Sequence, residues 1–252
     1  MQAQRLAAAR GASWVIGGLA LYRRGPPLLV MLTMFYLLVA VGSSLLAPVG
    51  PFLMSLLLPM LTVLVANGCR ILDRPAGSPL DHRALLTSIA SQRVPLLRLG
   101  LMQLGGTLLV LGLDSLIEGG DLALLAVDEE AVQPLHMLRL LVIATPMFMA
   151  FWFAPLLTAW DEVPAAKSLF FSLVAALRNW RAFLAYAATV AVAGVLLPAL
   201  LLALAAAISA DLFLVLSSAL RMLLFLIFVP VLMASVYLSY KDVFQQTEAA
   251  DA

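Results

Sequence analysis

Six apolar runs of about 20 residues each constrain this chain more than any other feature of its sequence. A helical run of that length crosses the roughly 30 Å hydrocarbon core of a bilayer. Strands at that depth need shorter segments in which apolar and polar residues alternate, whereas these runs are continuous and rich in Leu and Ala. We therefore predict an all-α, polytopic transmembrane helical bundle. The expected spans are Leu28–Leu46, Pro51–Cys69, Val94–Leu113, Met137–Trp160, Phe183–Ala206 and Leu216–Leu238.

The composition agrees with a chain that has the bilayer as its solvent. Of its 252 residues, 63% are hydrophobic and only 12% are charged. Soluble domains are roughly 45–50% apolar and about 25% charged. The single cysteine, Cys69, permits no intrachain disulfide and no cysteine-based metal site. We treat residues 1–245 as one integral membrane domain and residues 246–252 as a short polar tail.

The distribution of charge predicts the orientation of the spans. Lys and Arg lie before the first span, between the second and third, between the fourth and fifth, and after the sixth. The loop over residues 114–134 holds six carboxylates and no base. By the positive-inside rule, we expect both termini to be cytoplasmic.

The stretch "SLFFSLVAALRNWRAF" (168–183) separates its residues onto two helical faces. Leu169, Leu173 and Leu177 fall on one face, and Ser168 and Ser172 fall on the other. This pattern favours a helix that lies in the membrane interface, with burial under the bundle as the alternative. We expect lipid headgroup contacts from the basic and aromatic residues beside such stretches: Arg23, Arg24, Arg93, Arg178, Trp180 and Arg181.

A similar arrangement occurs before the first and third spans. In each case an amphipathic turn or two leads to Arg, then to a Pro or aromatic residue, then to a span. The second, fourth and sixth spans also carry a proline: "LLLPMLTVLVANG", "WFAPLLTAWDE" and "IFVPVLMASVYLSY". We therefore predict three copies of one unit, in which an interfacial helix precedes a hairpin of two spans. Internal repeats are common in transporter folds, and duplication also produces scaffolds.

Several stretches resemble one known family: "GGLALYRRGPPLLVML", "FWFAPLLTAW" (151–160), "KSLFFSLVAALRNWRAF" (167–183) and "ASVYLSYKDVF" (234–244). The sequence is similar there to a family of uncharacterised proteobacterial inner-membrane proteins with six spans, and the resemblance covers nearly the whole chain. That family has no assigned activity, so the resemblance implies a fold and a location and no site residues. A weaker similarity is to membrane domains attached to glycerophosphodiester phosphodiesterases. Their soluble catalytic domain does not occur in this sequence, so we expect no such activity.

Motifs for chemistry are absent from the sequence. It has no phosphate-binding loop, no zinc-protease helix and no nucleophile elbow. The two histidines, His82 and His136, are expected on opposite sides of the membrane. We therefore predict no catalytic residue, no metal site and no cofactor, and nucleic acid is not an expected partner.

Charged residues near the predicted outer ends of the spans form one candidate cluster. The candidate pairs are Arg139 with Asp114 and Arg221 with Asp211, although we favour the alternative in which each side chain reaches the headgroups alone. A candidate cavity lies between the fourth and sixth spans, where prolines interrupt the helices, although such residues also serve packing alone. Its expected lining is Gln103, Thr107, Thr145, Trp152 and Pro155.

These features favour a non-enzymatic accessory or envelope-organising protein. Its expected partners are membrane lipids, together with a membrane protein or a second copy of the chain. The alternative is a transporter of small solutes or lipid that uses the proline-broken helices. An intramembrane enzyme would need acid, base or metal ligands clustered at one depth, and the sequence offers no such cluster.

Overall fold

Helices make up almost all of the chain that the structure, a computed structural model, describes, and no strand occurs in that part. The described residues are 4–46, 48–75, 81, 83–118 and 134–244. The α-helices are α1 (Ala9–Arg24), α2 (Pro26–Ser44), α3 (Gly50–Leu72), α4 (Ala84–Ser91), α5 (Arg93–Glu118), α6 (Pro134–Trp160), α7 (Ala165–Arg178), α8 (Trp180–Ala191), α9 (Leu197–Ile208), α10 (Ala210–Leu223) and α11 (Val229–Phe244).

The prediction of six spans is confirmed. Six helical segments within the described residues are long and apolar enough to cross a membrane. The first four are α2, α3, α5 and α6. The fifth runs through α8 and α9, and the sixth through α10 and α11. The sixth, Ala210–Phe244, is longer than predicted because it begins six residues earlier, directly after Ser209, and continues past Leu238 into the polar residues of the base.

The order of elements recurs three times along the chain. A short helix, α1, α4 or α7, precedes a pair of spans in each unit. Each short helix packs against the second span of the preceding unit: α4 on α3, and α7 on α6. The first short helix packs on α11 and α8, which belong to the last unit. The three units are therefore connected in a closed cycle.

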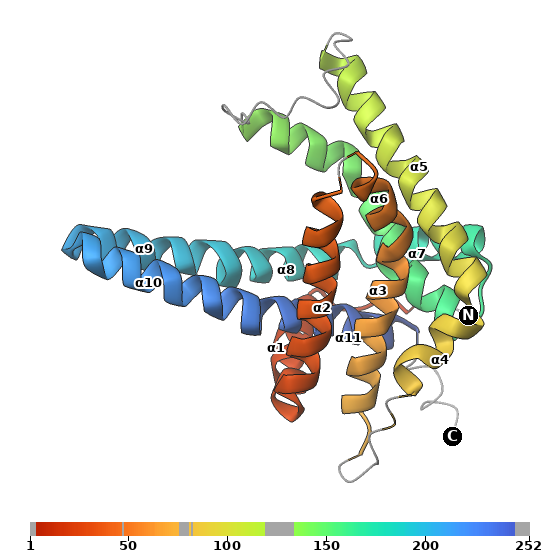
Figure 1. The fold of residues 1–252 in the computed structure, drawn as a ribbon, viewed down its shortest axis with the longest axis horizontal. Coiled ribbons are helices and arrows are strands. Elements are labelled where there is room, and N and C mark those ends of the chain that lie inside the picture. Colours follow the sequence, from red (N-terminus) through yellow and green to blue (C-terminus); the bar gives the residue numbers. More distant parts are fainter. Residues whose placement is uncertain (1–3, 47, 76–80, 82, 119–133, 245–252) are drawn as a thin grey trace.

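The buried core lies at one end of the molecule, which we call the base. It contains the ends of α3, α6 and α11 that meet the short helices, with Val63, Phe153, Leu157 and Tyr240 fully buried there. The opposite ends of the spans diverge, and the hairpin of α9 and α10 projects sideways from α2 and α3 (Figure 1). Its apolar side chains, such as Leu204, are exposed as expected for contact with lipid.

Helix α7 packs with its small and hydroxyl-bearing residues inward. Ser168, Ser172 and Ala175 are fully buried, whereas Phe170 is 62% exposed. The Ser172 hydroxyl accepts a hydrogen bond from the backbone N–H of Phe153 (2.9 Å) and donates one to the carbonyl of Met149 (2.8 Å). The face that carries Ser168 and Ser172 therefore packs against α6, because small residues allow the two helices to approach closely. The apolar face of α7 points outward.

Two π-helical segments interrupt the fifth and sixth spans, at Val192–Leu196 and Leu224–Phe228. Each ends two residues before a proline, which lacks the N–H that helical hydrogen bonding requires. The segments contact each other, since a Cβ added at Gly194 would lie 2.5 Å from the Phe228 ring. The hydroxyl of Tyr22 in α1 donates to the carbonyl of Leu226 (3.1 Å), four residues before Pro230. The two π-helical segments therefore lie where the projecting hairpin of α9 and α10 continues into α8 and α11.

Candidate functional site: the polar base

Each unit contributes an aspartate close to the end of its second span. Asp73 follows α3 directly, Asp161 follows α6 directly, and Asp242 lies in the last turn of α11. The chain turns at these points from an apolar span into a polar segment, so a carboxylate is tolerated there. All three carboxylates accept hydrogen bonds from side chains of other helices. They connect the units at the base.

Asp73 joins α3 to α11 and to α1. Its carboxylate accepts hydrogen bonds from the hydroxyl of Tyr237 (2.9 Å) and from Lys241 Nζ (2.6 Å). Arg24, at the end of α1, lies 3.4 Å away through Nη1. Charge-assisted hydrogen bonds of this kind are stronger than neutral ones. One carboxylate therefore holds three helices together.

Asp242 holds the start of α1. Its carboxylate accepts hydrogen bonds from Arg10 Nε (3.0 Å) and Nη2 (2.6 Å) and from Trp14 Nε1 (2.8 Å). Trp14 is only 1% exposed. Nearby, the backbone N–H of Leu6 donates to the side chain of Asn179 (2.8 Å), which lies between α7 and α8. The segment that leads into α1 is therefore bound to the last unit by polar contacts.

Asp161 accepts a hydrogen bond from the Tyr240 hydroxyl. Burial raises the pKa of the Asp161 carboxyl above its ordinary value, although the Tyr240 hydroxyl and the charge of Arg70 act in the opposite direction. The Arg70 guanidinium lies over the Trp160 ring, 5.2 Å from its centroid. The segment "ASVYLSYKDVF" (234–244) thus supplies the side chains that connect α11 to α1, α3 and α6.

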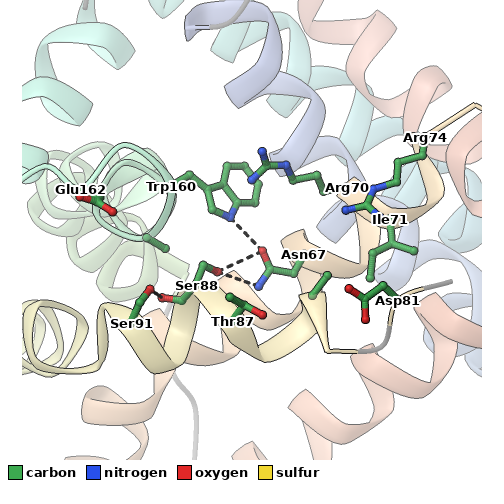
Figure 2. Close-up of a pocket in the computed structure, with 12 residues that line it drawn as sticks. Asn67, Arg70, Ile71, Arg74, Asp81, Thr87, Ser88, Ser91, Trp160 and Glu162 are labelled. Carbon is green, nitrogen blue, oxygen red and sulfur yellow. Dashed lines mark hydrogen bonds between the residues drawn. The ribbon is translucent and has the colours of Figure 1, made fainter. Parts of the chain in front are cut away.

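A polar pocket of about 480 Å³ opens between the end of α3, α4 and the end of α6 (Figure 2). Asn67 forms part of its wall and is 4% exposed. Its Nδ2 donates to the Leu85 carbonyl (2.8 Å) and to the Ser88 hydroxyl (3.0 Å), and its Oδ1 accepts from Trp160 Nε1 (2.9 Å). These bonds fix the three helices around the pocket.

Four charged side chains line this pocket: Arg70 and Arg74 at the end of α3, Asp81 before α4, and Glu162 after α6. In the part of the chain that the structure describes, none of the four takes part in an ion pair. Glu162 has a φ of 55°, which is uncommon for a residue other than glycine. The pocket therefore presents charges of both signs, with the Asp161 carboxylate also within the electrostatic reach of Arg70.

The candidate outer cluster has one close pair in the structure. Arg139 Nε lies 2.6 Å from Asp114, which is 6% exposed, and His136 Nε2 lies 3.9 Å from the same carboxylate. Asp211 and Arg221 do not pair. They lie ten positions apart on α10, which is about 15 Å along a helix, and Arg221 instead donates to the Ser217 carbonyl (3.4 Å). The candidate pairing of Arg221 with Asp211 therefore does not occur in the structure.

The residues of the predicted cavity do not line the described pocket. Trp152 packs edge-on against Phe183 and Tyr186 and donates to the Ser239 hydroxyl (3.2 Å). Thr145 is half-buried and donates to a carbonyl of its own helix. The remaining members are the half-buried Gln103 and Thr107 and the buried Pro155.

The six residues expected to contact headgroups are all exposed, although Arg24 also reaches Asp73 and Arg181 lies over the Trp180 ring. Sequence reasoning missed the pocket at the base. A signal was available, because Arg70 and Arg74 lie close together in the sequence where a span ends. Among the described residues, no group of three His, Cys, Asp or Glu is placed to hold a metal ion.

Comparison with known proteins relates the chain to an inner-membrane protein. It is 33% identical over 202 residues to a probable inner membrane protein of Burkholderia thailandensis, and the match covers 74% of each chain. The chain belongs to the same family. It is a multi-pass inner-membrane protein, in agreement with its six spans. No family model and no solved structure matches it, and nothing in these comparisons connects it to glycerophosphodiester phosphodiesterases.

Proposed function

We propose that this protein is a non-enzymatic accessory or envelope-organising factor that acts through contacts with lipids and with a protein partner. The observation that carries the proposal is the division of the molecule into two parts. The polar side chains of the base are engaged in holding helices together. The diverging hairpins instead present exposed apolar side chains, such as Leu200 and Val215, along most of their length.

The chemistry of the base supports a structural role for its carboxylates. Asp73, Asp161 and Asp242 each accept hydrogen bonds from tyrosine, tryptophan or basic side chains of neighbouring helices. A catalytic carboxylate needs an open position next to a reacting group. These carboxylates are used for connection between units, as expected of a scaffold.

The charges of the base support an orientation with both termini in the cytoplasm. Arg10, Arg24, Arg70, Arg178 and Lys241 all belong to helices that meet there. Lys and Arg are enriched in cytoplasmic segments of inner-membrane proteins. The base would then face the cytoplasm, and the tips of the hairpins would face the periplasm.

Native mass spectrometry of the protein, extracted gently from its own membrane, tests this proposal. The expected result is a protein partner retained at fixed stoichiometry, with or without bound lipid. The comparison variant is Asp242→Ala. It removes the contacts that hold α1 on α11, so we expect it to retain less of the partner than the wild-type protein does. Recovery of the protein alone, combined with solute movement in proteoliposomes, would contradict the accessory role.

A transporter of small solutes or lipid is the second candidate. It is favoured by the paired π-helical segments, because interrupted helices expose backbone groups inside a membrane. The test is movement of a fluorescent phospholipid between the leaflets of proteoliposomes. Lipid movement that requires the wild-type protein would favour this candidate. The Gly194→Leu variant should abolish it, because the larger side chain would displace Phe228.

A further inference from the structure

We propose that the pocket between α3, α4 and α6 binds a headgroup that carries both a phosphate and an amine, of the phosphoethanolamine class. The inference deepens the proposed function, because it names the lipid class that the base would recognise. It rests on the charges of the pocket, their depth along the spans and the size of the opening.

The two arginines provide the phosphate site. Arg70 lies in the last turn of α3, and Arg74 lies two residues after the end of that helix. Figure 2 shows both guanidinium groups beside the pocket, with Arg70 next to Trp160. Guanidinium groups bind phosphate oxygens through paired hydrogen bonds. No carboxylate among the described residues neutralises either group in an ion pair.

Two carboxylates of the lining, Asp81 and Glu162, suit an ammonium group. Figure 2 shows Asp81 on the side of Arg74, and Glu162 at the other end of the pocket. The hydroxyls of Thr87 and Ser91 already donate to backbone carbonyls, so their remaining lone pairs act as acceptors. A purely anionic headgroup would meet the two carboxylates with like charge, which disfavours it. A zwitterionic headgroup satisfies both sets of charges.

The position of the pocket matches the headgroup layer. Arg70 lies in the last turn of the span Gly50–Leu72, and Trp160 is the last residue of the span His136–Trp160. Tryptophan is enriched at this depth because its ring is apolar and its N–H is polar. The pocket therefore opens where these spans leave the hydrocarbon.

The size of the pocket also fits a headgroup rather than a single ion. Its volume of about 480 Å³ falls within the range of roughly 300–1,000 Å³ that is usual for small-molecule sites. An inorganic phosphate would occupy only part of this space. Phosphoethanolamine carries its phosphate and its ammonium at opposite ends, so one molecule can contact an arginine and a carboxylate of this lining together.

The experiment is a set of binding titrations with the full-length protein purified in a mild detergent. The four probes are short-chain phosphatidylethanolamine, short-chain phosphatidylglycerol, soluble phosphoethanolamine and inorganic phosphate. We expect phosphatidylethanolamine to bind about tenfold more tightly than phosphatidylglycerol, the ratio that one favourable charge contact provides. The two ethanolamine probes distinguish the sources: tighter binding of the lipid assigns the site to the membrane, and equal binding assigns it to a free solute with the same chemistry.

Two double variants separate the halves of the site. Arg70→Gln with Arg74→Gln should weaken binding of both lipids about tenfold or more. Asp81→Asn with Glu162→Gln should retain the phosphate contacts and reverse the preference in favour of phosphatidylglycerol. The matched control, Arg5→Gln with Arg98→Gln, removes two exposed arginines that lie outside the pocket and outside the expected headgroup contacts, and it should change nothing. Unchanged melting temperatures without lipid would show that each variant is folded.

Two results would overturn the inference. One is equal affinity of the wild-type protein for the two lipids, and the other is full binding by the Arg70 and Arg74 variant. Either result leaves the proposed function intact if native mass spectrometry still shows a retained protein partner. The failures of the two proposals are therefore distinguishable.

Discussion

Asp242 is the residue on which the position of α1 depends most. Its carboxylate accepts hydrogen bonds from Arg10 and from the buried Trp14. Asp242→Ala leaves a buried indole N–H without its acceptor, so we expect the free energy of unfolding to fall by about 2 kcal/mol. Thermal unfolding of the purified protein in detergent measures this loss. Asp211→Ala, at an exposed position in the first turn of α10, is the control and should change stability by less than about 0.5 kcal/mol.

Asp161 should make stability depend on pH. Burial raises its pKa above the ordinary value of 3.8, so the folded protein holds this proton more tightly than the unfolded chain does. The resulting stabilisation is complete below the ordinary value and is lost as the pH rises through the raised folded value. Asp161→Asn removes this dependence, and its melting temperature relative to wild type should therefore increase with pH. A constant difference from about pH 4 to about pH 8 would contradict the assignment.

The contact partners of individual residues in the base could not be predicted from the sequence. Tyr237 contacts Asp73 across 164 positions of the chain, and Arg10 contacts Asp242 across 232. Nothing local in the sequence specifies such pairs, because they depend on how the units close into a cycle. The candidate pairing of Asp211 with Arg221 fails for a simpler reason: the turn before the sixth span was placed too late, and both residues belong to α10.

Gly11 controls how closely α1 approaches α8. A Cβ at this position would lie 1.9 Å from the Ala182 carbonyl oxygen and 2.6 Å from the Tyr186 backbone nitrogen, neither of which is a flexible side chain. Gly11→Ala must therefore separate the two helices, and we expect a loss of about 1–3 kcal/mol. Melting temperature and protease cleavage within α1 are the measurements.

Gly105 in α5 provides the matched control for Gly11. A Cβ there meets no atom within 4 Å. Since alanine is the better helix former by about 1 kcal/mol, Gly105→Ala should be neutral or stabilising. Equal effects of the two substitutions would contradict the close packing of α1 on α8.

Helix α7 shows what an amphipathic pattern predicts and what it does not. The separation of Ser and Leu faces was readable from the sequence. The choice of the buried face was not, because inside a membrane small residues are favoured at helix contacts and apolar residues can face lipid. Ser172 also bonds to the backbone of α6 next to Pro155, and only the structure reveals which hydroxyl occupies that position.

At the scale of the whole molecule, the six spans were predictable because length and apolar composition determine them. The order of elements within the three units was visible in the sequence as well. The divergence of the hairpins and the pocket at the base were not, since both depend on which helices pack together. Periodicity within one span carries no information about its partners.

Cysteine labelling tests the proposed orientation of the whole molecule. Cys69 is fully buried, so the wild-type protein should react weakly and serves as the background control. Ala210→Cys, at an exposed position at the start of α10, should react with a membrane-impermeant maleimide in spheroplasts. Arg178→Cys, exposed at the end of α7, should react only after the membrane is opened. The reverse pattern would place the base in the periplasm.

The docking of α1 on the last unit has a consequence for synthesis. Arg10 leaves the ribosome 232 residues before Asp242, its partner. At roughly 5–20 residues per second, that interval lasts about 12–46 s. During this time the buried face of α1, with Trp14 at its centre, has no native partner to cover it. The first helix of the chain is therefore among the last to reach its final place, and a nascent chain interrupted before α11 would display it to the quality-control machinery of the cell.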